Sequence, residues 1–392
     1  MSGIDWDRLR DIRRDIHAHP ELAFAEHRTA ALVAEHLRGL GIEVTTGIGG
    51  TGVVGVIRGS ADGPTVALRA DMDALPITEE LPRPHASQTP GVMHACGHDG
   101  HTAMLLGAAE ILSGARNFAG TVVVVFQPAE EGAGGAPAMI ADGVLTDFGI
   151  REIYGIHNIP GIEAGHFAVR PGTQLASFDD LDIVLSAAGG HAMAPHLTGD
   201  VVVAGAALVT ALQTIVARRL DPSVMAVVSI TAFNAGSTNN VMPPTARLRG
   251  TARCLSPQAR DEIEKLVREI SASVATAHGV DVEVGYEHRY PCTVNDATAA
   301  ARSARVAAEV VGADRVDPNC AGILAAEDFA FFLDEVPGAY AFIGNGPITP
   351  ERGPVHNPAY DFNDDVIEPG SRYLAAIALE ALADLRTPPT GP

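Results

Sequence analysis

The chain has 392 residues, with 27 basic and 48 acidic side chains, so its formal net charge at pH 7 is −21. This charge argues against a protein that binds nucleic acid or an anionic membrane surface, because both need a basic face. A single lysine, Lys265, and the absence of a GxxxxGK[ST] motif argue against a Schiff-base enzyme and a P-loop kinase. The four cysteines form neither a CxxC pair nor the dense pattern of a disulfide scaffold.

The first 180 residues alternate between helical and extended patterns. Amphipathic periodicity predicts helices at residues 5–16, 26–38 and 101–114. Strands are predicted at residues 53–59, 65–71, 121–126 and 152–158. The run TVVVVF at 121–126 is continuously apolar and β-branched, which is typical of a strand buried on both faces of a layered sheet. This part of the chain therefore predicts an α/β domain.

From about Phe178 the pattern changes to that of a smaller α+β module. Its elements are predicted, in order, as a strand at 181–187, a helix at 201–220, strands at 223–236 and 246–254, a second helix, and a strand at 280–286. The second helix begins with Ser256 as its N-cap and Pro257 at the first position, and it ends at Gly279. The order β-α-β-β-α-β is that of a ferredoxin-like unit.

Helical patterns then return at residues 298–311, 327–333 and 367–385, with a strand at 339–346. We therefore predict a discontinuous α/β catalytic domain interrupted by an inserted ferredoxin-like α+β domain, divided as residues 1–178, 179–289 and 290–392. Two overlapping GxGxxG matches, at 47–52 and 50–55, precede a strand rather than a helix. A glycine-rich hairpin is thus favoured over a dinucleotide-binding loop, which needs a helix there.

The densest chemical signal is the run MHACGHDGH at residues 93–101, which combines three histidines and a thiol immediately before a predicted helix. Sulfur and imidazole ligands at this density suit zinc or a neighbouring first-row divalent metal. A second signal is Glu130-Glu131, directly after the buried strand, where active sites of layered α/β sheets gather. One of two adjacent carboxylates can bind metal while the other acts as a general base, although a solvated pair in a turn is the simpler interpretation without the nearby cluster.

Other polar residues remain open to a structural interpretation from their spacing alone. His157 and His356 each stand singly beside a predicted strand or helix, and two acids close the strand in ALRADMDALP. The run Gly189-Gly190-His191-Ala192 and the pair Asn239-Asn240 fit ordinary turn chemistry in the smaller module.

Taken together, eight motifs occur in the order found in a known family. These are RADMDALP, MHACGHDGHTAMLLGAA, QPAEEGAGG, GIHN, GGHAMAPH, NNVMP with GTAR, AEDFAFF and VHNP. The chain resembles the aminoacylase-like dinuclear metallohydrolases, a branch of the zinc metallopeptidases that includes hippurate hydrolases, indole-acetyl-amino-acid hydrolases and N-acyl-L-amino acid amidohydrolases. The resemblance extends over nearly the whole chain.

The resemblance implies roles for individual residues. Two divalent metal ions, of zinc, manganese or nickel, would be held by Cys96, His98, Glu131, His157 and His356. Glu130 would be the general base, and Asp73 would support a ligand. The smaller domain would act as a lid and mediate dimerisation, so that His191 reaches the partner's active site, while Asn240 and Arg253 would contact the substrate.

The implied activity is a metal-dependent amidohydrolase that cleaves the amide bond of acetyl, benzoyl or aryl-acetyl amino acids. The alternatives are a dipeptidase or carboxypeptidase of the same superfamily and a non-catalytic metal-binding relative. We expect a homodimer or homotetramer with a small-molecule N-acyl amino acid as its substrate. A charged N-terminus without an apolar segment predicts a cytoplasmic location.

Overall fold

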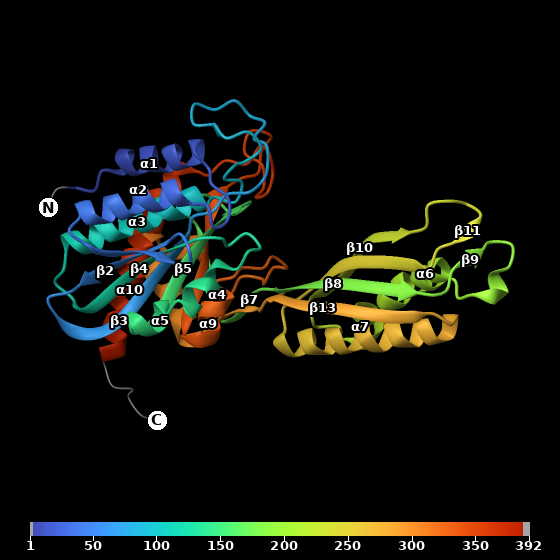
Figure 1. Cartoon of the computed structure of the whole chain (residues 1–392). Helices are drawn as coiled ribbons and strands as arrows, with labels where there is room; N and C mark the ends of the chain where they lie inside the picture. The colour runs from blue at the N-terminus through green and yellow to red at the C-terminus, as the bar shows by residue number, and fades with distance from the viewer. Residues whose placement is uncertain (1–2, 387–392) are drawn as a thin grey trace, which may run out of the picture. The chain divides into compact units, whose positions relative to one another are not determined.

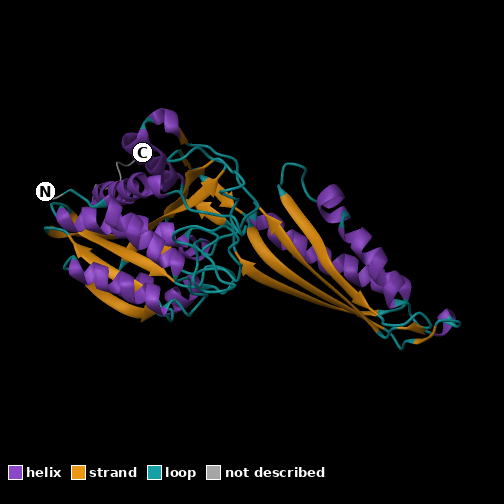
Figure 2. Cartoon of the chain, turned by 90° about the horizontal axis from the view of Figure 1, so that it is seen from above, coloured by secondary structure: helices purple, strands orange, loops and turns teal. Residues whose placement is uncertain are grey.

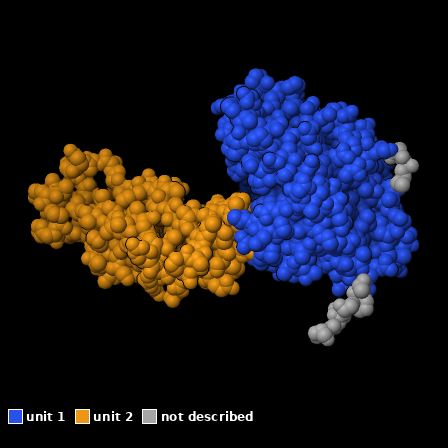
Figure 3. Space-filling view, turned by 180° about the vertical axis from the view of Figure 1, so that it is seen from behind, with its two compact units in different colours: residues 1–172, 294–321, 328–392 blue, residues 173–293, 322–327 orange. Residues whose placement is uncertain are grey.

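The structure, a computed structural model, describes residues 3–386 and divides them into two compact units (Figures 1 and 3). Unit 1 contains the chain up to Gly172, residues 294–321, and the chain from Asp328 onward. Unit 2 contains Thr173–Thr293 and Gly322–Glu327. The outermost residues of the predicted ranges 1–178 and 290–392 lie outside the described part.

Unit 1 is built on an eight-stranded sheet with the order β1-β2-β4-β3-β5-β16-β6-β15. The strands are β1 (Glu43–Ile48), β2 (Gly52–Arg58), β3 (Ala61–Asp71), β4 (Ala119–Gln127), β5 (Ile150–Pro160), β6 (Phe167–Ala168), β15 (Val316–Asp317) and β16 (Gly338–Gly346). Strand β3 runs parallel to both β4 and β5, and β16 runs parallel to β5, so the carboxyl ends of these four strands share one edge. Strands β1 and β2 form an antiparallel hairpin across the glycine-rich segment, as predicted.

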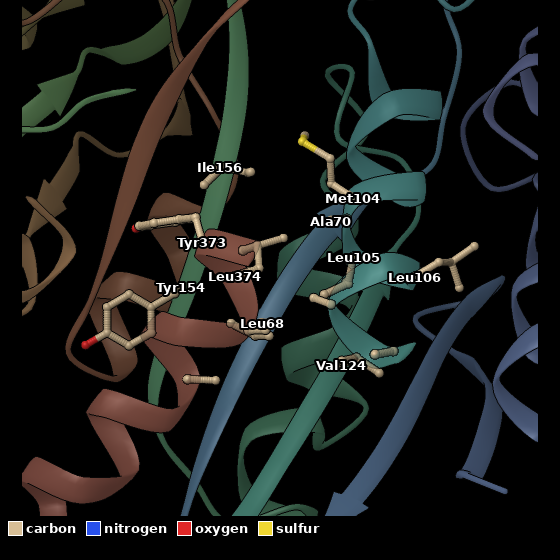
Figure 4. Close-up of a cluster of buried hydrophobic side chains, with 14 of the residues drawn as sticks. Leu68, Ala70, Met104, Leu105, Leu106, Val124, Tyr154, Ile156, Tyr373 and Leu374 are labelled. Carbon is tan, nitrogen blue, oxygen red and sulfur yellow. The ribbon is translucent and has the colours of Figure 1, made fainter. Parts of the chain in front are cut away.

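The helices of unit 1 are α1 (Trp6–Ala18), α2 (His27–Gly39), α3 (His98–Gly114), α4 (Gly135–Ala141), α5 (Val144–Asp147), α8 (Ala297–Val311), α9 (Ala330–Glu335) and α10 (Ile367–Arg386). Short 3₁₀ turns occur at Ala313–Arg315 and Asp364–Val366. Helices α3 and α10 pack against each other and against β3. Figure 4 shows this core, in which side chains such as Leu105 of α3 and Leu374 of α10 lie beside Leu68 of β3. The four valines of β4 are fully buried, which confirms the prediction for that strand.

Unit 2 is a four-stranded antiparallel sheet with the order β10-β12-β8-β13. Its main elements are β8 (Ser177–Ser186), α6 (Val201–Leu212), β10 (Ala226–Ala235), β12 (Thr245–Cys254), α7 (Pro257–His278) and β13 (Asp281–Tyr290). Helices α6 and α7 pack on each other and on the sheet, whose strands are orange in Figure 2. This arrangement confirms the ferredoxin-like order predicted from the sequence.

The remaining elements of the chain are short. They are β7 (Gly172–Leu175), β9 (Gly190–His191), β11 (Val241–Met242), β14 (Thr293–Asn295), a 3₁₀ turn at Pro195–Leu197 and a π-helical turn at Ile215–Arg219. Strand β7 pairs with β14, and β9 pairs with β11. Among the described residues, no helix combines the length and the apolar character that crossing a membrane requires.

Two predicted helices extend several residues beyond the helices in the structure, and α3 begins at His98, three residues before its predicted start. The helix predicted at 201–220 ends at Leu212, and the π-helical turn follows, in which the Leu220 N–H donates to the Ile215 carbonyl at 3.0 Å. The helix predicted at 327–333 begins only at Ala330. Asp328 lies before this helix, and its carboxylate accepts hydrogen bonds from elsewhere in unit 1, including two contacts of 2.8 and 2.9 Å from the Gln127 amide.

Candidate metal centre

The candidate site lies at the edge where the parallel strands of unit 1 end. Asp71 is the last residue of β3, and it pairs with Gln127 at the end of β4. Glu130 and Glu131 follow β4, His157 lies near the end of β5, and the segment that carries His356 follows β16. Cys96 and His98 come from the turn into α3, in which Gly97 adopts a left-handed conformation with a φ of 97°.

The structure brings all five predicted ligands together, in two groups that share Cys96. In each group one ligand atom per residue lies within 4.8 Å of the others, and the groups are Cys96-His98-His157 and Cys96-Glu131-His356. The Cys96 Sγ is 3.4 Å from His157 Nε2, and Glu131 Oε1 is 3.3 Å from His356 Nε2. The sulfur of Cys96 is therefore shared by both groups.

The hydrogen bonds of His98, which is buried, and of His157, which is half-buried, leave one nitrogen of each ring directed at this cluster. His98 Nδ1 donates to Asp73 Oδ1 at 3.1 Å, because a carboxylate oxygen can only accept. His157 Nδ1 donates to the Asn158 carbonyl at 2.7 Å. In the neutral form of either ring Nε2 therefore carries a lone pair, which is the tautomer that a metal ligand needs.

A metal ion would satisfy two atoms that are otherwise left without partners. His98 Nε2 and Glu131 Oε1 are buried and lie 3.8 Å apart, and among residues 3–386 neither atom has a hydrogen-bond partner. The His356 ring reaches Glu131 Oε1 only at an ion-pair distance of 3.3 Å. Burying polar atoms in this state is costly unless something binds them. With a thiolate, three imidazoles and a carboxylate, the donor set fits zinc or a neighbouring first-row divalent metal.

The electrostatics of the cluster favour a cation near His98. Burial alone would lower the pKa of His98, but the carboxylates of Asp71, Asp73 and Glu131 outweigh it and raise the pKa to about 10. This surplus of negative charge would stabilise a metal ion in place of the proton. In contrast, burial and the neighbouring His101 ring hold the pKa of His157 well below its ordinary value, so this ring stays neutral.

Asp73 supports two of the predicted ligands. Its Oδ1 accepts from His98, and its Oδ2 accepts from the Glu131 backbone N–H at 2.9 Å. The side chain is buried, so these bonds have no competition from bulk water. The sequence prediction gave Asp73 one ligand to support, and the structure adds the second contact.

Glu130 is held at the rim of the same cluster by a strained turn. Ala129, directly before it, has a φ of 56°, a conformation that costs energy for any residue with a Cβ. The Ala129 N–H donates to Glu26 Oε1 at 2.9 Å, and the Asp328 N–H lies 3.4 Å from Glu130 Oε1. Carboxylate oxygens of Glu130 and Glu131 lie within 4.8 Å of a ring nitrogen of His98.

Glu26 was not singled out in the sequence, where a lone glutamate before a helix carries no signal that it accepts a hydrogen bond from Ala129.

His356 is the most exposed of the five, with 52% of its side chain accessible to solvent. Its φ of 62° is again left-handed, and its N–H donates to the Ala95 carbonyl at 2.7 Å, beside Cys96. This bond ties the segment carrying His356 to the turn that carries the thiol.

His101 belongs to the same sequence cluster but is committed to other contacts. Its Nδ1 donates to Asp71 Oδ1 at 2.7 Å, and its Nε2 accepts from the Asn158 backbone N–H at 3.0 Å. Asp71 in turn accepts from Arg69, which is buried and also bonds Asp328. Neither His101 nor Arg69 was assigned a role from the sequence, because nothing in their spacing separates a ligand from a neighbour that orients one.

The other predicted residues lie in unit 2, in two places. His191 on β9 pairs with Val241 on β11, so His191 and Asn240 are neighbours. Arg253 lies near the opposite end of β12, where it stacks on the Phe178 ring at 4.7 Å and donates to the Leu324 carbonyl. The eight residue-to-residue steps from Thr245 to Arg253 span roughly 26 Å, so within one chain Arg253 does not share a contact with His191 and Asn240.

The fold and the clustered ligands define the class of metal-dependent hydrolases. Residues 67–380 match the peptidase family M20/M25/M40, and the chain belongs to this family. The chain is 40% identical over 371 residues to the hippurate hydrolase of Campylobacter jejuni, covering 95% of this chain and 96% of that protein. It is 39% identical over 384 residues to thermostable carboxypeptidase 1 of Saccharolobus solfataricus, covering 96% and 95% of the two chains.

A solved structure gives the same result for the fold. The YXEP protein of Bacillus subtilis, described as a dinuclear metal-binding peptidase of the M20 family, superposes with a TM-score of 0.85 at 34% identity. The match covers 96% of this chain and 98% of that one. The resemblance noted in the sequence and the two-domain fold class are thereby confirmed.

Proposed function

We propose that the protein is a metal-dependent amidohydrolase that splits N-acyl amino acids into a carboxylate and a free amino acid. The observation that carries the proposal is the shared cluster around Cys96, with Glu130 beside it. A protein that only binds metal has no use for a carboxylate held next to the metal ligands. The similarity to a hippurate hydrolase supports an N-acyl amino acid as the substrate class.

Glu130 is the group that we propose moves the proton. Metal ions bound at these ligands would lower the pKa of a water molecule toward about 7 and polarise the scissile carbonyl. Glu130 accepts a proton from the attacking water as the new C–O bond forms, and it delivers that proton to the amide nitrogen as the C–N bond breaks. Asp73 holds His98 and Glu131 in place throughout, and it does not exchange a proton itself.

Unit 2 supplies the groups that we propose complete the site. His191 and Asn240, which are neighbours on β9 and β11, would donate hydrogen bonds to the oxyanion of the tetrahedral intermediate. Arg253, at the other end of the sheet, would have to hold the substrate carboxylate of a different active site from the one that His191 serves. This division fits the predicted homodimer or homotetramer, in which the smaller domain of one chain serves its partner.

Two metal ions per chain are proposed, since Cys96 belongs to both ligand groups. Thiolate and imidazole ligands favour zinc, whereas the carboxylate of Glu131 also suits manganese or nickel. A cytoplasmic location is proposed with the enzyme because a reducing compartment keeps the shared thiol reduced.

A matched pair of variants separates the base from the ligand. Glu130→Gln should lower turnover by about 10²–10⁴-fold, the usual contribution of a general base, while its metal content stays at the wild-type level. Glu131→Gln should lose bound metal, measured by plasma emission after gel filtration. Near-wild-type turnover in Glu130→Gln, or a parallel loss of metal in both variants, would contradict the proposed roles.

A carboxypeptidase is the second candidate, and the 39% identity to thermostable carboxypeptidase 1 favours it. The two activities can be compared on one panel of N-acetyl, N-benzoyl and indole-acetyl amino acids and dipeptides, with zinc, manganese or nickel added to metal-free protein. We expect the highest kcat/KM on the N-acyl amino acids. Higher values on dipeptides would assign the chain to the peptidases, and no hydrolysis with any metal would leave a binding protein.

A further inference from the structure

Asn158 follows the proposed ligand His157 directly and is completely buried near the end of β5. A buried primary amide needs partners for two N–H donors and one carbonyl acceptor. In this structure every one of those partners belongs to a segment that carries a proposed metal ligand or contacts one.

The side-chain amide makes its donor contacts beside the turn into α3. Asn158 Nδ2 donates to the Cys96 backbone carbonyl at 2.6 Å, and it lies 3.0 Å from His101 Nε2, which also accepts from the Asn158 backbone N–H. The amide is therefore bonded to the main chain of Cys96, the residue common to both ligand groups. The backbone carbonyl of Asn158, which is not part of this amide, accepts from His157 Nδ1 and so sets the tautomer of that ligand.

The side-chain oxygen of Asn158 accepts a hydrogen bond from the segment that carries His356. Tyr360 donates its hydroxyl to Asn158 Oδ1 at 2.7 Å, and Tyr360 lies four residues after His356 in the same segment. Burial raises the pKa of Tyr360 well above its ordinary value, so the hydroxyl remains a donor. A Cβ added at Gly97 would meet both the Asn158 amide and the Tyr360 hydroxyl, which shows how closely the three segments are packed.

We propose that Asn158 is a positioning residue of the metal centre, whose single amide fixes the spacing of the segments that carry Cys96, His157 and His356. The proposal rests on the ligand set of the proposed function. Three of the five ligands come from segments far apart in sequence, and their relative placement decides whether one thiolate can serve two metal positions. An amide suits this task because it donates and accepts without adding charge to an already acidic site.

The test compares Asn158→Ala with Asn295→Ala. Asn295 is also buried in unit 1, and its amide makes hydrogen bonds that include those to the Arg170 and Tyr340 carbonyls and from the Tyr340 N–H. Asn295 contacts none of the proposed ligands in these bonds, so it controls for the loss of a buried amide. The probe is Co²⁺ titrated into metal-free protein, with its d–d and thiolate charge-transfer bands recorded and the affinity obtained by competition with a chelator.

We expect Asn158→Ala to bind Co²⁺ at least about tenfold more weakly, the usual effect of losing an orienting contact behind metal ligands, with an altered thiolate band. Asn295→Ala should lose a similar amount of thermal stability without metal but keep its Co²⁺ affinity within about twofold. Equal affinities for Asn158→Ala and wild type, or equal losses in the two variants, would overturn the proposal. A wild-type protein that lacks the thiolate band would instead refute the ligand set itself.

If Asn158→Ala does not fold, Tyr360→Phe removes only the hydroxyl that donates to Asn158. Its control is Tyr373→Phe, since the Tyr373 hydroxyl is also buried and contacts Ser303 Oγ at 2.6 Å, away from the site. We expect weaker Co²⁺ binding in Tyr360→Phe but not in Tyr373→Phe. The same affinity in both would count against the proposal.

Discussion

Replacing Asp73 with asparagine tests how one carboxylate holds two ligands. Both oxygens of Asp73 accept hydrogen bonds, from His98 Nδ1 at 3.1 Å and from the Glu131 N–H at 2.9 Å. Asparagine offers one acceptor oxygen and one NH₂ group, so one of these donors must face another donor. If the NH₂ group faces His98, the ring takes the opposite tautomer, in which Nε2 carries the proton and cannot bind a metal.

The cost can be estimated from the two arrangements. Keeping the correct His98 tautomer in Asp73→Asn leaves the Glu131 N–H unpaired and opposed, at a cost of about 1–3 kcal/mol, which is roughly a 5- to 150-fold loss of metal affinity. Zn²⁺ affinity measured by chelator competition would show this loss. The control Asp142→Asn replaces a carboxylate that accepts from the Gly49 N–H at 2.7 Å and can still do so as an amide. Unchanged Zn²⁺ affinity in Asp73→Asn would refute the reasoning.

Two further predictions concern stability. Burial lowers the pKa of His17, but the ion pair with Asp99 outweighs burial and raises this pKa from 6.5 to about 9. The ion pair therefore stabilises the fold fully below pH 6.5, and its contribution is lost as the pH rises through 9. In urea unfolding, the free energy of unfolding of the wild type should fall between pH 6.5 and 9, and this fall should be up to about 3 kcal/mol smaller in His17→Gln. If the free energies of the two proteins change equally with pH, the raised pKa of His17 is contradicted. Gly91 and Gly97 both have a positive φ, but only Gly97 has side chains close to where a Cβ would lie. Gly91→Ala should therefore lower the free energy of unfolding by about 1–2 kcal/mol, and Gly97→Ala should lower it clearly more. Equal losses of stability in the two variants would argue against tight packing of Gly97 on Asn158.

The sequence predicted those parts of the fold that are set by local chemistry. Ser256 caps α7 through its contact with the Ala259 N–H, and Gly279 ends that helix in a left-handed conformation, as expected from their positions. The helix predicted through Leu220 ends early because Ile215, inside the π-helical turn, is buried in the core of unit 2. The apolar pattern of residues 213–220 fits an α-helix and a π-helical turn equally well, so only the tertiary packing distinguishes the two structures.

The sequence predicted the proposed metal ligands of the site but not most of the residues that hold those ligands in place. The run around Cys96 drew attention to a metal site, and the family resemblance selected His98 from the three histidines. From the sequence, His98 and His101 are equally suitable as ligands. In the first turn of α3, His98 keeps a ring nitrogen without a hydrogen bond, whereas both ring nitrogens of His101 make hydrogen bonds. Asn158 was visible within GIHN, but its contacts depend on residues 62 positions before it and 202 after it.

The thiol of Cys96 also makes the centre dependent on a single atom. Because both ligand groups include this sulfur, the two metal ions that we propose would lose it together. Oxidation to a sulfinic acid would replace a soft donor with hard oxygens in both positions in one event, and this step is not reversed by ordinary thiols. We therefore expect hydrogen peroxide to release both metals together, whereas damage to His356 or His157 would affect one position first.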